Sequence, residues 1–183
     1  LLTTRSTMYP TVYFHPFVRG AELMLARAAN SAISSNKFTS RDFTTFTDHK
    51  FLSELDRAGG FPQKTVKDFE NRRIVKSAVS ITKKQAEDSG LNRSSKEEYE
   101  NSIAAKLGLD ASDIYVDLPP QSVVLGLKVK ILKDNDEVVL ARNLSRLVSG
   151  LYEAQFDHWR GRVYGPSGIE DKVLFEASKV LGL

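Results

Sequence analysis

The residues best suited to chemistry in this 183-residue sequence lie close together, between Arg5 and Arg19. Two arginines, two tyrosines and a histidine share this short passage: Arg5, Tyr9, Tyr13, His15 and Arg19. Arginine binds phosphate oxygens through two parallel N–H donors, and tyrosine stacks on a base or sugar while its hydroxyl donates to a phosphate. These residue types favour recognition of a small phosphorylated molecule. On residue chemistry alone, the start of an ordinary amphipathic helix is the simpler interpretation, with Tyr9 and Tyr13 on one face.

Elsewhere the sequence lacks the motifs of independent catalysis or metal binding. The three histidines, His15, His49 and His158, are far apart, and neither HxxxH nor HExxH occurs. Cysteine is absent, which excludes a thiolate nucleophile and a zinc–thiolate site, and there is no GxGxxG or P-loop sequence. We interpret Asp134-Asn135-Asp136 as a hairpin turn, because Val139 stands where a calcium loop needs glycine. We therefore expect no catalytic residue, metal ligand or cofactor site within this chain.

The composition is that of a globular, water-soluble protein, with 41% hydrophobic and 27% charged residues. Its 26 basic and 23 acidic residues give a net charge of +3 and are interspersed along the chain, so nucleic-acid binding is not expected. No apolar run approaches the roughly 20 residues that span a bilayer, and no contact with membranes is expected. We expect a cytoplasmic location.

Three helices are expected to position the Arg5–Arg19 passage. The helical spacing of apolar residues predicts the first helix from about residue 9 to 34, with a break near Pro16, which has no N–H to donate. A loop rich in serine and threonine leads to Thr47, a favourable N-cap for a second helix that Gly59-Gly60 ends. Pro62 can open a third helix that extends to about residue 71.

From residue 73 the pattern changes to short strands and helices. Residues 74–81 predict a strand, and the polar stretch 82–94 predicts a loop. Ser94 and Ser95 are each followed three positions later by a glutamate, which is typical of a capping-box start to a helix that ends near Gly108.

The last third of the sequence predicts a hairpin and two further helices. Leu127, Val129 and Ile131 alternate with lysines, which indicates a half-buried strand. The remaining expected elements are a strand at 114–118, a turn at 134–137 leading into a second hairpin strand, a helix around 144–151, a strand at 159–164 and a last helix after residue 169.

Helices first, then mixed strands and helices, predict an α+β protein with antiparallel strand pairing. We place a boundary near residues 72–73. Residues 1–72 would form a helical segment, and residues 73–183 a small mixed α+β lobe.

Three segments, in order, resemble HD-domain phosphohydrolases of the dGTPase and deoxynucleoside-triphosphate triphosphohydrolase branch. The first is the run Tyr9-x-x-Val12-Tyr13-x-His15-x-x-x-Arg19-x-x-Glu22-x-Met24-Leu25, which is similar to the helix that follows the family's metal-binding core. The other two are Phe46-Thr47-Asp48-x-x-Phe51-Leu52-x-x-Leu55 and Arg72-Arg73-Ile74-Val75-Lys76. Together they cover residues 5–76, and the N-terminal helices would then extend an all-α HD core.

The resemblance implies roles for the passage at the start of the chain. Arg5 would contact the substrate triphosphate, Tyr13 would line the nucleotide pocket, and His15 would lie near both the pocket wall and subunit contacts. The sequence departs from the closest triphosphohydrolases at Tyr9 and Pro16, which stand in place of a histidine and a lysine.

The resemblance also implies a divalent metal, held by an H…HD…D set that would precede the first helix. We therefore interpret the chain as the C-terminal portion of a phosphohydrolase acting on a phosphorylated, nucleotide-like substrate. It would supply a pocket wall and scaffold to the upstream HD domain of the same protein, or contacts for a homo-oligomer, and be inactive alone. The alternative is a non-catalytic α+β module that binds a small anionic ligand or a protein partner, with Arg160 and Arg162 as candidate contacts.

Overall fold

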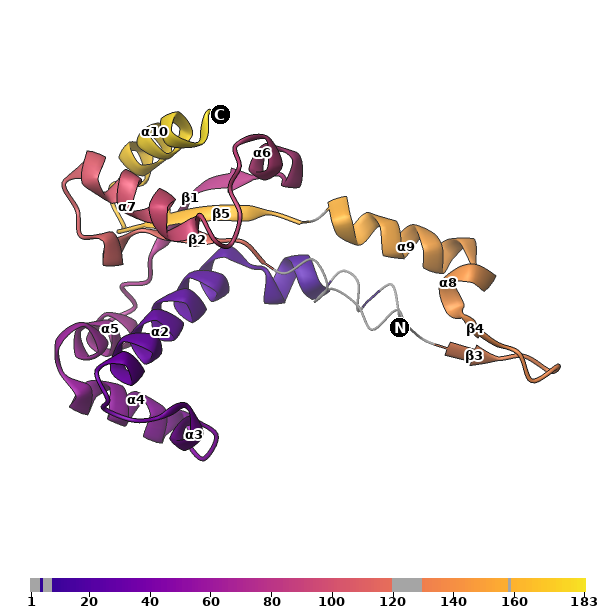
Figure 1. Cartoon of the computed structure of the whole chain (residues 1–183), viewed down its shortest axis with the longest axis horizontal. Helices are drawn as coiled ribbons and strands as arrows, with labels where there is room; N and C mark the ends of the chain where they lie inside the picture. The colour runs from indigo at the N-terminus through magenta and orange to yellow at the C-terminus, as the bar shows by residue number, and fades with distance from the viewer. Residues whose placement is uncertain (1–3, 5–7, 120–129, 158) are drawn as a thin grey trace.

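A three-stranded antiparallel sheet with helices on both faces forms the centre of the protein (Figure 1). The computed structural model describes residues 4, 8–119, 130–157 and 159–183. The strand order is β1-β5-β2, with β1 at Lys76–Ile81, β5 at Gly161–Gly165 and β2 at Tyr115–Asp117. Since β5 comes from the far end of the chain and pairs with both other strands, the sheet closes only when distant segments meet.

Alternation along the strands divides the sheet's side chains between two environments. On one face, Val116 and Val163 are fully buried against helices α7 (Lys96–Leu107) and α10 (Glu170–Leu181). On the other face, Tyr115, Asp117 and Tyr164 point toward helix α2 (Pro16–Ser34). Helices thus cover both faces of the sheet, and its polar side chains lie mainly on the face toward α2.

Helix α2 also forms the core of the N-terminal helical unit. Its later turns pack against α4 (Asp48–Ala58) and α5 (Gly60–Glu70). The buried contacts join small residues of α2 to apolar residues of the other helices, namely Ala28, Ala32, Leu55 and Val66. Alanine suits this position because it favours helix and lets neighbouring helices approach closely.

The predicted helix boundaries in this unit are confirmed except at the start of the third helix, because α5 begins at Gly60 and not at Pro62. A π-helical turn, η1 (Tyr9–Tyr13), precedes the break, and Pro16 is the first residue of α2, where no N–H is required. The Thr47 hydroxyl caps α4 by accepting from the N–H of Lys50, and α4 ends at Gly59, which has a positive φ of 74°. The Ser/Thr-rich loop holds one short helix that was not expected, α3 (Ser40–Phe43), capped by Thr39 and Asp42.

Two predictions for the segment between β1 and α7 are wrong. Residues 82–94 are not only loop, because helix α6 (Lys83–Asp88) begins at a capping box formed by Thr82 and Gln85. The capping box predicted for α7 is also absent: the Ser95 side chain makes no cap hydrogen bond and instead accepts from the N–H of Asn92. Gly108 ends α7 in a left-handed conformation, as expected.

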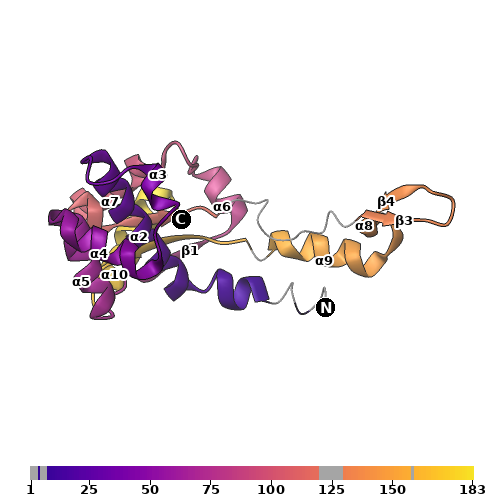
Figure 2. The ribbon, with the colours of Figure 1, turned by 90° about the horizontal axis from the view of Figure 1, so that it is seen from below.

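Between β2 and β5, the described residues 130–157 extend away from the rest of the protein (Figures 1 and 2). They comprise hairpin strands β3 (Lys130–Leu132) and β4 (Val138–Leu140), followed by α8 (Ala141–Leu144) and α9 (Arg146–Asp157). The hairpin is confirmed. The half-buried strand is not, because all three residues of β3 are exposed; positions 127 and 129 lie outside the described residues.

The fold class is therefore α+β, as the sequence predicts. A short 3-10 turn, η2 (Ala111–Asp113), leads into β2, so all the strands expected within the described residues are present. The boundary at residues 72–73 stays a prediction, and α2 contacts both the helical unit and the sheet.

Close packing of β5 against α10 predicts a large effect of one methyl group. A Cβ added at Gly165 would lie 2.7 Å from Cγ2 of the fully buried Val173. We expect Gly165→Ala to lower the free energy of unfolding by about 1–3 kcal/mol, measured by urea denaturation. The same change at Gly150 in α9, where an added Cβ meets nothing within 4 Å, should not lower it. Equal losses in both variants would contradict this packing.

Candidate functional site

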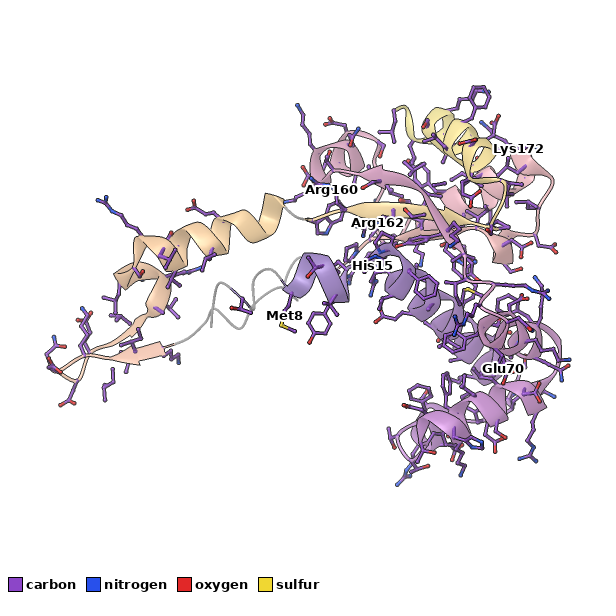
Figure 3. All side chains as sticks on the ribbon, turned by 180° about the vertical axis from the view of Figure 1, so that it is seen from behind. Met8, His15, Glu70, Arg160, Arg162 and Lys172 are labelled. Atoms are coloured by element: carbon purple, nitrogen blue, oxygen red, sulfur yellow. The ribbon has the colours of Figure 1, made fainter. Side chains whose placement is uncertain are left out.

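The Arg5–Arg19 passage leads into the first turn of α2, beside one end of the sheet. His15 is the N-cap of α2, and its Nδ1 accepts a hydrogen bond of 3.3 Å from the N–H of Phe17. His15 is exposed, and Tyr13 is 51% exposed. Figure 3 labels His15 before α2, and Arg160 and Arg162 at the start of β5.

Arg19 fastens this end of α2 to the sheet. Its Nε and Nη2 donate to the two carboxylate oxygens of Asp117 at 2.9 and 2.6 Å, a bidentate pair. Its third donor, Nη1, reaches Glu22 at 2.6 Å. Asp117 is only 2% exposed, and its hydrogen bonds raise the pKa of Arg19 above the ordinary value, against the opposing effect of burial. The Arg19 guanidinium is therefore held in place by two carboxylates.

A glycine next to Arg19 allows α2 to come this close. A Cβ added at Gly20 would lie 3.0 Å from the carbonyl oxygen of Val75, just before β1. Further along the interface, the N–H of Val75 meets the sulfur of Met24 at 3.5 Å. Gly20 and Met24 of α2 thus both lie close to the backbone of Val75.

Strand β5 adds two further residues to this face of the sheet. Arg162 lies opposite Asp117 in the strand register, and Tyr164 lies opposite Tyr115. The Tyr164 hydroxyl is fully buried and has no hydrogen-bond partner among the described residues; Arg162 approaches it without a bond of normal geometry. Loss of hydration raises the pKa of Tyr164 to about 12, and nearby Arg162 and Arg19 oppose that rise.

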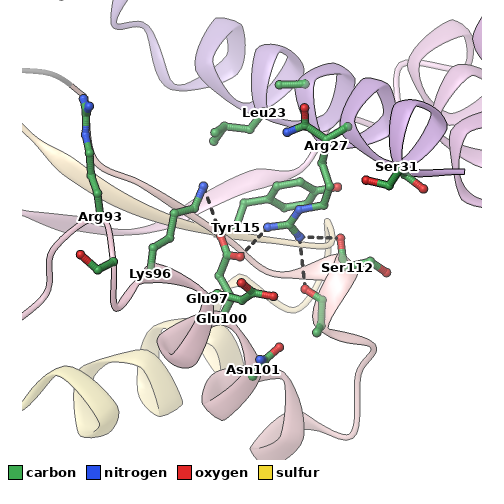
Figure 4. A pocket seen from close by; sticks show the side chains of 15 residues that line it. Leu23, Arg27, Ser31, Arg93, Lys96, Glu97, Glu100, Asn101, Ser112 and Tyr115 are labelled. Atoms are coloured by element: carbon green, nitrogen blue, oxygen red, sulfur yellow. Dashed lines mark hydrogen bonds and ion pairs between the residues drawn. The ribbon is translucent and has the colours of Figure 1, made fainter. Parts of the chain in front are cut away.

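A cleft of about 550 Å³ separates α2 from α7, and a second arginine of α2 crosses it (Figure 4). Arg27 lies over the ring of Tyr115, 3.8 Å from its centre, and its Nη2 pairs with Glu100 at 2.7 Å. Its Nη1 donates to three backbone carbonyls between residues 111 and 114. The other carboxylate oxygen of Glu100 accepts from the N–H of Val116 at 2.8 Å. Arg27 and Glu100 thus satisfy each other's charge across this cleft.

The structure brings three of the five predicted site residues to one end of α2. Tyr13, His15 and Arg19 lie there together, with Tyr13 and His15 facing solvent and Arg19 turned toward the sheet. Tyr9 belongs to η1, but its side chain is outside the described residues, as is the whole of Arg5.

Two residues that organise the site were missed at the sequence level. Asp117 carried a usable signal: it follows an apolar run and alternates with Tyr115, so both must face the same side of the strand. Glu100 carried no such signal, because it is one of several glutamates in α7 and nothing local marks it as buried.

Metal-binding and membrane-spanning features were also sought. The described part of the chain contains no group of three or more His, Asp or Glu side chains placed to hold a metal ion. Among the described helices, none combines the length and apolar character needed to cross a bilayer.

Comparison with known protein families gives a match over the full length of the chain. The sequence profile of the family described as "HD associated region" matches residues 1–183, the full length of the chain. No curated protein matches the sequence.

The two carboxylates bound to Arg19 differ in burial. We therefore expect them to contribute very differently to the free energy of unfolding. Asp117→Asn leaves a half-buried guanidinium without its charged partner, and we expect a loss of roughly 2–5 kcal/mol in the free energy of unfolding. Glu22→Gln removes an equally short contact, but Glu22 is exposed, so the loss should stay below about 1 kcal/mol. Urea denaturation of both variants measures the difference, and similar losses would refute the assignment.

The Tyr164 hydroxyl has no hydrogen-bond partner among the described residues, so its removal should not lower the stability of the protein. Tyr164→Phe should be at least as stable as the parent at pH 7, because no hydrogen bond is lost. In Tyr99→Phe, the lost bond from the hydroxyl to the carbonyl of Ser89, 2.5 Å long, should cost about 1 kcal/mol.

The raised pKa of Tyr164 predicts how this difference depends on pH. The native state keeps the phenolic proton up to pH about 12, whereas the unfolded chain releases it near 10.0. The contribution of the protonated Tyr164 hydroxyl to the free energy of unfolding is therefore fully present below pH 10, and it is lost as pH rises toward 12. The stability advantage of Tyr164→Phe over the parent should grow across that interval in urea titrations; an advantage that shrinks would contradict the burial of the hydroxyl.

Proposed function

The chain belongs to the HD associated region family, and on that premise we propose that it forms part of a metal-dependent phosphohydrolase acting on a phosphorylated, nucleotide substrate. Membership of this family links the chain to HD-domain proteins. The finer proposal is that it follows an HD domain of the same protein and forms one wall of that domain's substrate pocket. It would also serve as scaffold, or as a contact between subunits.

The arrangement at the start of α2 is the observation that supports this proposal most strongly. Tyr13 and His15 are exposed on a helix end that a bidentate ion pair holds against the sheet. Such a rigid, polar and solvent-facing surface suits a group that must be held in place for catalysis in a neighbouring domain.

The proposed residue roles follow from these positions. Arg5 would bind the substrate phosphates, and Tyr9 and Tyr13 would line the pocket beside the sugar or base. His15 would donate or accept a hydrogen bond at the pocket edge. Arg19, held by Asp117 and Glu22, would act as a positioning residue that fixes this surface.

The divalent metal of the proposed enzyme would belong to the HD domain. When bound there, such a metal supplies an activated water and stabilises charge on the phosphate. The described residues of this chain offer no set of ligands for it, and their proposed part is limited to binding and orienting the substrate.

The alternative, an anion-binding module centred on Arg160 and Arg162, uses the same end of the protein. Both arginines lie at the start of β5 (Figure 3), and Arg162 is opposite Asp117, the partner of Arg19, in the sheet. A phosphorylated ligand bound there would contact β5 rather than Arg5, so single substitutions separate the two proposals.

The test compares variants of the protein that carries both this chain and its HD domain. With a divalent metal and deoxynucleoside triphosphates, we expect Arg5→Ala to lower kcat/KM about 10- to 100-fold, the effect of losing a charged hydrogen bond. Arg57→Ala, at an exposed arginine of α4, should leave kcat/KM unchanged. In calorimetry with the same nucleotides, binding that is insensitive to Arg5→Ala but lost in Arg162→Ala would favour the alternative. No metal-dependent hydrolysis at all would overturn the proposal.

A further inference from the structure

The large apolar side chains that this protein exposes are concentrated in two segments. Fourteen large hydrophobic residues are exposed in the described part of the chain. Five of them lie between residues 8 and 18, and five more lie between residues 131 and 147. Single exposed hydrophobic residues are common on protein surfaces, but a concentration of them marks a surface that another folded unit covers.

The first of these surfaces is formed by η1 and the first turn of α2. Its exposed residues are Met8, Val12, Tyr13, Phe17 and Val18, which are 37% to 51% exposed. No Asp, Glu, Lys or Arg occurs between residues 8 and 18. This surface therefore offers water few groups to hydrate, and covering it with another apolar surface is favourable.

The second surface belongs to residues 130–157, which we call the arm. The main contacts of the arm are internal, since β3 packs on β4, and α8 packs on β4 and α9. Val148 is buried, but Leu132 is 65% and Leu147 67% exposed. Leu132 lies opposite Val138 in the hairpin register, so these two side chains share one face of the hairpin. A two-stranded hairpin is only marginally stable by itself in water, so the arm gains stability from a surface on which it can pack.

Both surfaces lie at the same end of the sheet. The arm falls between the end of β2 at Asp117 and the start of β5 at Gly161. The η1 surface is held at this end because Arg19, in the first turns of α2, binds Asp117. Figures 1 and 2, which are at right angles, show η1 and the arm extending from the body in the same direction. A single partner can therefore contact both surfaces.

The charges of the arm indicate what kind of partner this is. Residues 130–157 include four basic and five acidic residues, interspersed along the segment. Nucleic acids and anionic membranes require an excess of positive charge, so the arm suits neither. Its exposed leucines and valines instead suit an apolar surface of a folded protein domain. Family membership links the chain to HD-domain proteins, which identifies a domain of this kind.

We propose that the arm and the η1 surface together hold the HD domain of the same protein, with Leu132, Val138 and Leu147 packed on an apolar face of that domain. This inference rests on the proposed function, which supplies the HD domain, and it adds the surfaces through which the two parts bind. The arm contacts the domain at a second place, away from η1. Contact at two separated places restricts rotation of the HD domain and keeps its substrate pocket against Tyr13 and His15.

Photochemical cross-linking of the protein that carries both parts tests which surface covers the arm. With p-benzoylphenylalanine in place of Leu132, irradiation should join the arm to peptides of the HD domain within one molecule, identified by mass spectrometry. The same probe in place of Ser53, an exposed residue of α4 outside both surfaces, should give no such link. A link from the arm to a second copy of the protein, or no link at all, would overturn the proposal.

Hydrogen exchange of the same protein tests whether the apolar contacts hold the arm. Leu147 is the second residue of α9, where aspartate is favourable for the helix itself, so Leu147→Asp removes the apolar contact without opposing the helix. We expect Leu147→Asp to speed amide exchange across residues 130–157 at least tenfold and to leave exchange in β1 unchanged. Leu174→Asp, at an exposed leucine of α10 outside both surfaces, should not speed exchange in the arm. Unchanged exchange in Leu147→Asp, or equal effects of both substitutions on the arm, would contradict the docking.

These results are separable from a failure of the hydrolase proposal. Cross-links from the arm to the HD domain, in a protein that hydrolyses no nucleotide, would overturn the hydrolase proposal and leave the docking intact. Metal-dependent hydrolysis in a protein whose arm links only to a second copy would overturn the docking alone.

Discussion

Two buried carboxylates determine where the long helix α2 must lie. Asp117 in β2 and Glu100 in α7 are 2% and 6% exposed, and a charge removed from water to that degree is tolerated only when it is paired and hydrogen-bonded. Their partners are Arg19 and Arg27, eight residues apart on one helix. Since both pairs must form together, they fix the position of α2 along its axis and its rotation about that axis. The apolar contacts between α2 and the sheet then form at that position.

This constraint links the candidate site to the α+β lobe. The exposed His15 and Tyr13 belong to the N-terminal end of α2, but their position is set by a carboxylate on β2 and a backbone contact near β1. The later turns of the same helix pack on α4 and α5. A change in the sheet would therefore move the candidate site more directly than a change in the helical unit would, although both lie on one helix.

The sequence predicted those features whose causes are local. Pro16 marked a helix break and Thr47 a helix start, because a missing N–H and a side-chain cap act within one turn. Helix α6 was missed because its capping box lies in a short, lysine-rich stretch with a single buried residue, Ala86. The Arg19–Asp117 pair could not be predicted, because its members are 98 residues apart and meet only when β5 completes the sheet. The residue types of the site were visible, but not which of them the fold would use.

The arginines of α2 show the difference between a residue type that could bind an anion and a charge that the fold already uses. Arg19 was a candidate for anion binding by type, yet two carboxylates accept from its donors. Arg27, on the same helix, is likewise held by Glu100 and by three backbone carbonyls. An arginine held by buried acids stabilises the fold and would lose that role on binding a phosphate.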